Sequence, residues 1–142
     1  GVPVVAATGN SGYNDGVSWP ACVPRVVKVS AVNNHPVSNG RASYANLASA
    51  DAFPGDYIWL APGGGNGSIV ISSFIAGVGG MAGTSQAAPH VAGLYAAIKS
   101  AAPGVSVNGA SEWIRFNATV PVEVQLSPTN KQTFGRVRLP NL

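Results

Sequence analysis

The sequence predicts an α/β fold, because segments typical of buried strands and a segment typical of a helix occur in one chain of 142 residues. Residues 1–7 and 26–32 are apolar, strand-like runs, the first followed and the second preceded by turn-forming residues. Residues 85–101 are alanine-rich and helix-like, and Pro103 and Gly104 end this helix. A chain of this length is sufficient for one domain.

The first strand begins at Gly1 with no cap, turn or signal peptide before it. A central parallel strand needs neighbours on both sides, and the neighbours expected before this one are not in the sequence. We therefore expect a chain cut from a longer domain, with an incomplete core.

Three further segments follow the first strand. The strand at residues 26–32 comes after the turn-rich residues 19–24, and a second short helix is predicted at residues 109–117. Residues 63–68 form a glycine-rich loop that could suggest a phosphate site. No Gly-Lys-Ser/Thr follows it and no helix opens there, which argues against nucleotide binding.

The main helix presents one serine at its start. Ser85 lies between the tight turn at Gly83 and the small residues Ala87 and Ala88. Pro89 is tolerated only near a helix start, so the helix begins at or close to Ser85. The unpaired N–H groups of that turn and the helix dipole favour negative charge beside the hydroxyl, as acyl transfer by a serine requires. The alternative interpretation is an ordinary N-cap serine.

Residues 83–93, GTSQAAPHVAG, closely resemble the serine motif of the subtilisin-like serine proteases, the subtilases, which is usually GTSxAAPHVAG. Gln86 replaces the methionine most common after the nucleophile. Residues 6–10, AATGN, resemble the family's AAxGN strand end. The resemblance implies that Ser85 is the nucleophile and that the Asn10 amide and the Ser85 backbone N–H form the oxyanion hole.

By the same resemblance, the end of the first strand forms one wall of the primary substrate pocket. The residues of that wall are Ala6, Ala7, Thr8 and Gly9.

Weaker motifs follow in the family's order. Residues 19–32 resemble its YPAxxPxVIxVGA strand, residues 41–48 its AxFSNxG segment and residues 57–63 its dvxAPG strand end, while residues 120–133 are least similar. The resemblance implies a subtilisin-like three-layer α/β/α fold with a mostly parallel sheet. Residues 1–142 would be only the C-terminal part of that catalytic domain.

The acid and base of a serine protease triad are missing from the sequence. Subtilases carry them in DTG-like and HGTH-like motifs, which this chain lacks. His90 matches a non-catalytic packing or hydrogen-bonding histidine of the serine motif, and His35 lies in a polar loop. The acids, none in a family context, are Asp15, Asp51, Asp56, Glu112 and Glu123.

We therefore expect a serine endopeptidase that acts on polypeptides only when joined by the N-terminal half of the same catalytic domain. Two alternatives remain open. One is a subtilase-like pseudoenzyme or protein-binding module, and the other is a different serine hydrolase that draws its base from His35 or His90.

The resemblance implies secretion and no required cofactor, with calcium as a structural ion. The backbone carbonyls around Ala21 and Val23 match one cation site of the family. Cys22, the one cysteine, is expected to be a buried thiol or to pair with a cysteine in the absent half.

Composition excludes two classes of partner. The net charge of +3 comes from scattered Lys and Arg residues, which argues against nucleic acid, and no apolar run approaches the roughly 20 residues of a membrane span. Because 46% of residues are hydrophobic and 9% charged, we expect an isolated half-domain to aggregate.

Overall fold

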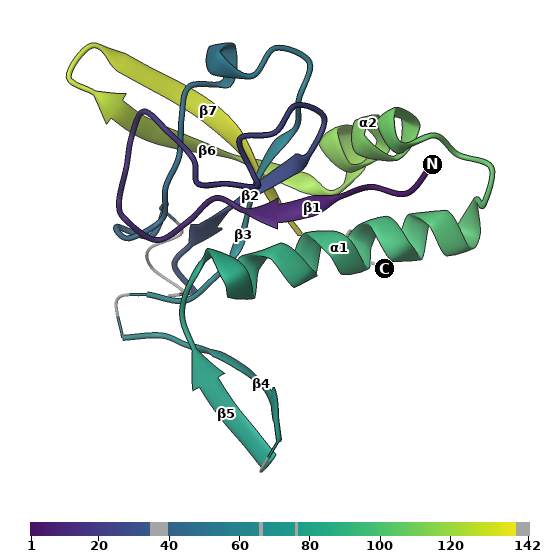
Figure 1. Cartoon of the computed structure of the whole chain (residues 1–142), viewed down its shortest axis with the longest axis horizontal. Helices are drawn as coiled ribbons and strands as arrows, with labels where there is room; N and C mark the ends of the chain where they lie inside the picture. The colour runs from purple at the N-terminus through teal and green to yellow at the C-terminus, as the bar shows by residue number, and fades with distance from the viewer. Residues whose placement is uncertain (35–39, 66, 76, 139–142) are drawn as a thin grey trace.

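The computed structural model describes residues 1–34, 40–65, 67–75 and 77–138 (Figure 1). A five-stranded sheet contains β1 (Val5–Ala7), β2 (Val27–Val32), β3 (Ile58–Pro62), β7 (Asn130–Val137) and β6 (Thr119–Ser127), in that order. A separate hairpin contains β4 (Val70–Phe74) and β5 (Gly77–Met81). The helices are η1 (Ala50–Ala52), α1 (Thr84–Ala101) and α2 (Val107–Asn117).

The five-stranded sheet is mostly parallel. β1, β2, β3 and β7 run parallel to their neighbours, and only β6 pairs antiparallel, with β7. The predicted α/β class is therefore confirmed. β1 is shorter than the strand expected over residues 1–7, and it lies at one end of the strand order.

Alternate residues of β2 face two different layers. Val27, Val29 and Ala31 pack in a cluster that includes buried residues of both α1 and α2, such as Val91 and Ile114. The described residues therefore supply the sheet and one helical layer of the expected fold.

The opposite face of the sheet is covered without a long helix. Ile58 and Leu60 of β3 pack there against Leu47 from a loop and Phe134 from β7.

Both long helices lie close to where the sequence predicts them. α1 begins at Thr84, one residue before Ser85, and ends before Pro103. α2 begins at Val107, where the Ser106 hydroxyl accepts the Gly109 N–H at 2.9 Å. This side-chain cap starts the helix two residues earlier than predicted.

The β4–β5 hairpin projects from the body of the molecule (Figure 1). Several of its apolar side chains are exposed, including Ile71 at 61% and Val78 at 77%. Period-two alternation puts alternate side chains on opposite faces, and neither face of this two-stranded ribbon has a covering layer in the described chain.

Cys22 is exposed, so the expectation of a buried thiol is wrong for this chain. The neighbouring Ala21 is fully buried and packs with Ala6 and Val26. Because Ala21 takes the inward position of this turn, the Cys22 side chain lies on the outside.

Candidate active site

The first turn of α1 leaves one backbone donor unused. Thr84 N donates to Asn10 Oδ1 at 2.9 Å, and Gln86 N donates to the Gly83 carbonyl at 3.1 Å. The N–H of Ser85, which is exposed, has no acceptor among the described residues. This N–H is therefore free to donate to an oxygen bound beside the Ser85 hydroxyl.

The Asn10 side chain is oriented by a donor whose identity is unambiguous. A backbone N–H can only donate, so the atom of Asn10 that faces Thr84 N must be the amide oxygen. The amide nitrogen then points away from Thr84, and it has no acceptor among the described residues. A methyl group added at Gly83 would lie 3.3 Å from this nitrogen, which places it next to the helix start.

Thr84 ties the helix to the strand end that carries Asn10. Its hydroxyl donates to Asn10 Oδ1 at 2.9 Å and accepts the Gly9 N–H at 3.1 Å, and the residue is fully buried. Asn10 Oδ1 therefore accepts two hydrogen bonds from Thr84. In the sequence, Thr84 is part of the serine motif but carries no predicted function.

The turn before Ser85 is held against the end of β3. Gly83 N donates to the Gly63 carbonyl at 2.8 Å. A methyl group added at Gly63 would lie 2.5 Å from Ala31 Cβ and 2.7 Å from the Gly83 carbonyl oxygen. These distances are too short for any side chain, so the close approach of β3 to the turn requires glycine.

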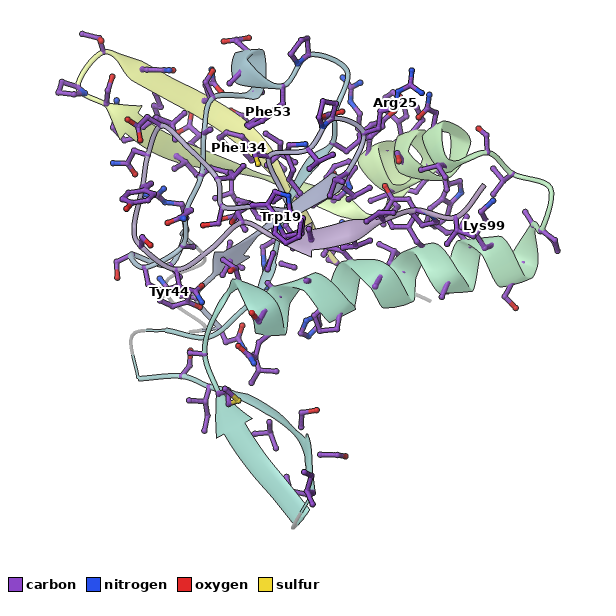
Figure 2. The ribbon with its side chains drawn as sticks, viewed as in Figure 1. Trp19, Arg25, Tyr44, Phe53, Lys99 and Phe134 are labelled. Atoms are coloured by element: carbon purple, nitrogen blue, oxygen red, sulfur yellow. The ribbon has the colours of Figure 1, made fainter. Side chains whose placement is uncertain are left out.

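Tyr44 supports the same turn from a loop beside the start of α1 (Figure 2). Its hydroxyl lies 2.9 Å from the Gly63 carbonyl oxygen and 2.7 Å from that of Gly64, and its one hydrogen is shared between these two acceptors. Burial raises the pKa of Tyr44, and a backbone hydrogen bond with Gly83 partly opposes this rise. The hydroxyl therefore stays protonated and donating at neutral pH.

The predicted substrate-pocket residues Ala6, Ala7, Thr8 and Gly9 lie at the end of β1 and directly after it, beside this site. Thr8 is fully buried, and its hydroxyl donates to the Asn46 carbonyl at 2.7 Å. Ala6 is buried too, and the N–H and carbonyl groups of Thr8 and Gly9 are all hydrogen-bonded within the chain. The half-buried Ala7 and Gly9 are therefore what a ligand could contact along this segment.

Gly9 and Asn46 fix the path of the chain around Asn10. Gly9 has a φ of 101°, and a methyl group there would lie 2.3 Å from Ser18 Oγ. Asn46 is fully buried, and its Oδ1 accepts the N–H groups of Ser11 and Tyr13 at 2.8 and 3.1 Å. The structure thus adds Asn46 to the residues that organise the site, a part that the sequence does not predict for it.

No acid and base pair accompanies Ser85 in the part of the chain that the structure describes. His90 is exposed, and its Nδ1 bonds with the Gln86 carbonyl of its own helix at 2.9 Å. His90 and Ser85 both line a cavity of about 360 Å³ between α1 and β4, but no hydrogen bond joins them. His35 lies outside the described residues.

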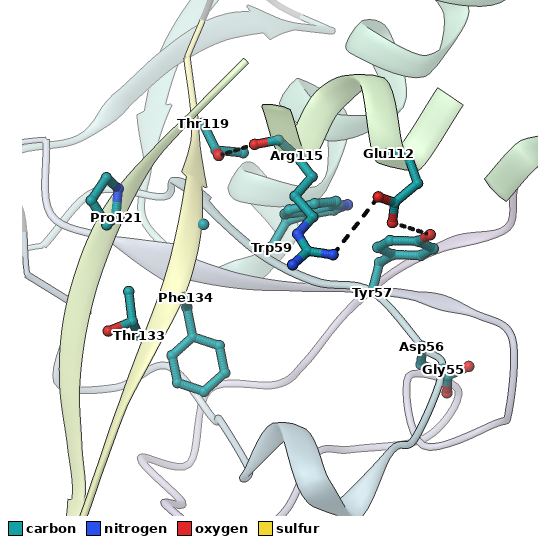
Figure 3. A pocket seen from close by; sticks show the side chains of 11 residues that line it. Gly55, Asp56, Tyr57, Trp59, Glu112, Arg115, Thr119, Pro121, Thr133 and Phe134 are labelled. Carbon is teal, nitrogen blue, oxygen red and sulfur yellow. Dashed lines mark hydrogen bonds and ion pairs between the residues drawn. The ribbon is translucent and has the colours of Figure 1, made fainter. Parts of the chain in front are cut away.

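Three of the acids form ion pairs elsewhere in the molecule, one of them Glu123 with Lys131. Asp56 forms an ion pair with Lys28 at 2.7 Å. Glu112 accepts the Tyr57 hydroxyl at 2.9 Å and pairs with Arg115 at 3.7 Å (Figure 3). Burial, followed by the bond to Glu112, raises the pKa of Tyr57 to about 12.

The cavity of about 490 Å³ that contains Tyr57 and Glu112 lies between β3, the β6–β7 pair and α2 (Figure 3). It holds none of the residues predicted for catalysis or substrate binding. Its charged groups Asp56, Glu112 and Arg115 are all held in ion pairs, so the candidate active site is the start of α1.

The described residues contain no group of three or more His, Cys, Asp or Glu side chains arranged to hold a metal ion. At the predicted calcium position, the Val23 carbonyl accepts a hydrogen bond from Lys28 Nζ at 3.2 Å. None of the helices described here is both long and apolar enough to cross a membrane.

Comparison with known proteins gives the same family in sequence and in structure. Residues 1–137 match the model of the subtilase family. The chain is 39% identical over 108 residues to subtilisin NAT of Bacillus subtilis subsp. natto, over 72% of this chain and 25% of that protein. It is 37% identical over 103 residues to the minor extracellular protease Epr of Bacillus subtilis strain 168, over 72% of this chain and 14% of that protein.

Solved structures agree. Sphericase superposes with a TM-score of 0.67 at 30% identity, over 83% of this chain and 40% of that one. A cold adapted subtilisin-like serine proteinase superposes with a TM-score of 0.66 at 29% identity, over 92% of this chain and 42% of that one. The chain spans only part of the length of these curated relatives, 25% for subtilisin NAT and 14% for Epr.

Proposed function

Because the chain belongs to the subtilase family, we propose that it carries the nucleophile and the oxyanion hole of a serine endopeptidase. The catalytic aspartate and histidine are supplied by a segment outside these 142 residues. The chain by itself is inactive, and the protein that contains it acts on polypeptides.

The observation that carries this proposal is the pair of unused donors beside Ser85. The Ser85 N–H and the Asn10 amide nitrogen lack acceptors among the described residues, although three hydrogen bonds through Thr84 join the two segments that carry them. Fixed donors of this kind stabilise an oxygen that becomes negative during the reaction, without having to reorient.

The mechanism follows from that geometry. Ser85 Oγ attacks the carbonyl carbon of the scissile peptide bond while the histidine of the other segment takes the hydroxyl proton. The oxyanion accepts hydrogen bonds from the Ser85 N–H and the Asn10 amide. The histidine then protonates the leaving amine as the C–N bond breaks, and water hydrolyses the acyl-enzyme, which restores the hydroxyl.

The position of Ala6, Ala7, Thr8 and Gly9 supports their proposed contact with substrate. They lead directly into Asn10, and their side chains are small, so a substrate side chain can approach the half-buried Ala7 and Gly9. We also infer secretion, since the relative Epr is described as extracellular.

Labelling with a fluorophosphonate probe tests the proposal, because the probe reacts only with an activated serine. We expect no labelling of the chain alone. Labelling should appear when the segment with the family's Asp and His motifs is added, and it should disappear in Ser85→Ala.

Two control variants separate the alternatives. We expect the assembled pair to keep its labelling in His35→Ala and in His90→Ala, since the base lies outside the chain. Labelling of the chain alone that is lost in His90→Ala would contradict the proposal in favour of an internal base. A properly assembled pair that never labels would indicate a pseudoenzyme.

A further inference from the structure

A fully buried ammonium group lies at the turn that precedes β2. Lys28, in the second position of β2, has no exposed surface. Its Nζ donates to the carbonyls of Val23 and Val26, at 3.2 and 3.1 Å, and to Asp56 Oδ2 at 2.7 Å. Two main-chain carbonyls and a carboxylate therefore surround one positive charge.

The hydrogen-bonding capacity of this ammonium is fully used. An ammonium has three N–H donors, and Lys28 has three acceptors. The ring of Phe53 covers the group, with its centroid 4.6 Å from Nζ. Phe53 is labelled in Figure 2.

Asp56 also has both of its oxygens bound. While Oδ2 accepts from Lys28, Oδ1 accepts the backbone N–H of Arg25 at 2.8 Å. Arg25 has a φ of 65°, the left-handed conformation that favours glycine. The carboxylate therefore holds the turn in a conformation that an arginine rarely adopts.

These oxygens are the ligands that a calcium ion prefers. The calcium site expected near Ala21 and Val23 would use the same Val23 carbonyl that Lys28 already occupies. A calcium ion would have to displace the ammonium, and the displaced charge would lose the three acceptors that compensate its burial. The residues present therefore do not fit a metal ion.

We propose that Lys28 is a built-in cation that takes the place of a structural metal ion at this turn. The Val23 and Val26 carbonyls and Asp56 bind the ammonium in the native protein, and removal of the lysine side chain converts them into a calcium site. This inference concerns stability, and it does not depend on the proposed activity.

Thermal unfolding of the complete protein that contains this chain tests the proposal. The wild type and Lys28→Ala are each melted in a chelator and in millimolar calcium. The matched control is the double variant Lys28→Ala/Asp56→Asn, which has the same opened space but no carboxylate. Any calcium site elsewhere in the protein contributes equally to all three.

We expect Lys28→Ala to melt below the wild type in chelator, because Asp56 loses its buried partner. Calcium should raise the Tm of Lys28→Ala by about 3 °C more than it raises that of the wild type or the double variant. An equal calcium response in all three proteins would overturn the proposal.

A second measurement applies even where Lys28→Ala does not fold. Isothermal titration with calcium should give the same number of bound ions for the wild type and for Asp56→Asn. Loss of one calcium ion in Asp56→Asn would show that the native turn binds metal, and it would overturn the proposal.

Discussion

Thr84 decides which way the Asn10 amide points. Both donors of Thr84, its N–H and its hydroxyl, hold the Asn10 oxygen, so the amide nitrogen is left for another acceptor. With the hydroxyl also accepting from Gly9, three hydrogen bonds join the strand end to the helix start. Thr84 is thus a positioning residue.

Thr84→Val should therefore lower kcat of the assembled protease by about tenfold with little change in KM. Thr84→Ser keeps the hydroxyl and should retain most of the activity. The loss should stay below the roughly hundred- to thousandfold that removal of the corresponding oxyanion donor costs in a subtilisin, because Thr84→Val leaves the Asn10 amide in place. Steady-state kinetics on a peptide substrate provides both constants.

The outcome that contradicts this prediction is a Thr84→Val enzyme with an unchanged kcat, or one with a raised KM alone. Either result would mean that the Asn10 amide keeps its orientation without the hydroxyl, or that Thr84 acts on substrate binding.

At this scale the sequence predicts residues whose motifs are local. The serine motif and the AATGN strand end are enough to select Ser85 and Asn10. The functions of Thr84 and Asn46 are not predicted, because both residues bond with partners far away in the sequence. The partners of Thr84 lie 74 and 75 positions away, and those of Asn46 lie 33 and 35 positions away. Such pairings exist only once the sheet has formed.

The end of β3 and the turn before α1 are packed as closely as two backbones permit. This contact depends on Gly63, whose added methyl group would overlap both Ala31 and the Gly83 carbonyl. The atoms that the added methyl group would meet are Ala31 Cβ and a backbone oxygen, so rotation of a side chain cannot relieve the clash.

Gly63→Ala should lower the free energy of unfolding by about 1–3 kcal/mol, the usual cost of overpacking. Gly93→Ala is the matched control, since a methyl group in this exposed part of α1 meets nothing within 4 Å. The control should gain about 0.5–1 kcal/mol through helix propensity. Urea unfolding of the assembled protein measures both, and equal stabilities for the two variants would refute the steric argument.

The elements differ in how far the sequence predicts them. β2, α1 and α2 are predicted to within two residues, because an apolar run or a cap and a stop signal mark each of them. β4 and β5 are not predicted, since glycine-rich and exposed strands lack a buried-strand pattern. β6 carries an alternating pattern, but it is not predicted either, because residues 120–133 match the family least.

The whole chain exposes apolar surface that a soluble monomer rarely leaves uncovered. The hairpin presents Ile71 and Val78 to solvent, and among the residues that the structure describes β1 has a paired strand on one side only. Open strand edges and apolar ribbons are the surfaces through which unassembled chains associate.

The isolated chain should therefore self-associate at micromolar concentration, as light scattering coupled to size-exclusion chromatography would detect. The double variant Ile71→Ser/Val78→Ser should reduce the association, because it removes apolar surface from the hairpin without touching the core. A soluble monomer with a cooperative melt would contradict this expectation.

The network of Gly9, Asn10 and Thr84 is closed within this one chain, and this has a practical consequence. Under the proposed function, the oxyanion-binding part of the site takes shape before the complementary segment arrives, so assembly has only to deliver the acid and the base. Fusing the two segments to a pair of interacting proteins would make hydrolysis report their encounter. The chain is thus a natural starting point for a split-enzyme sensor with a silent background.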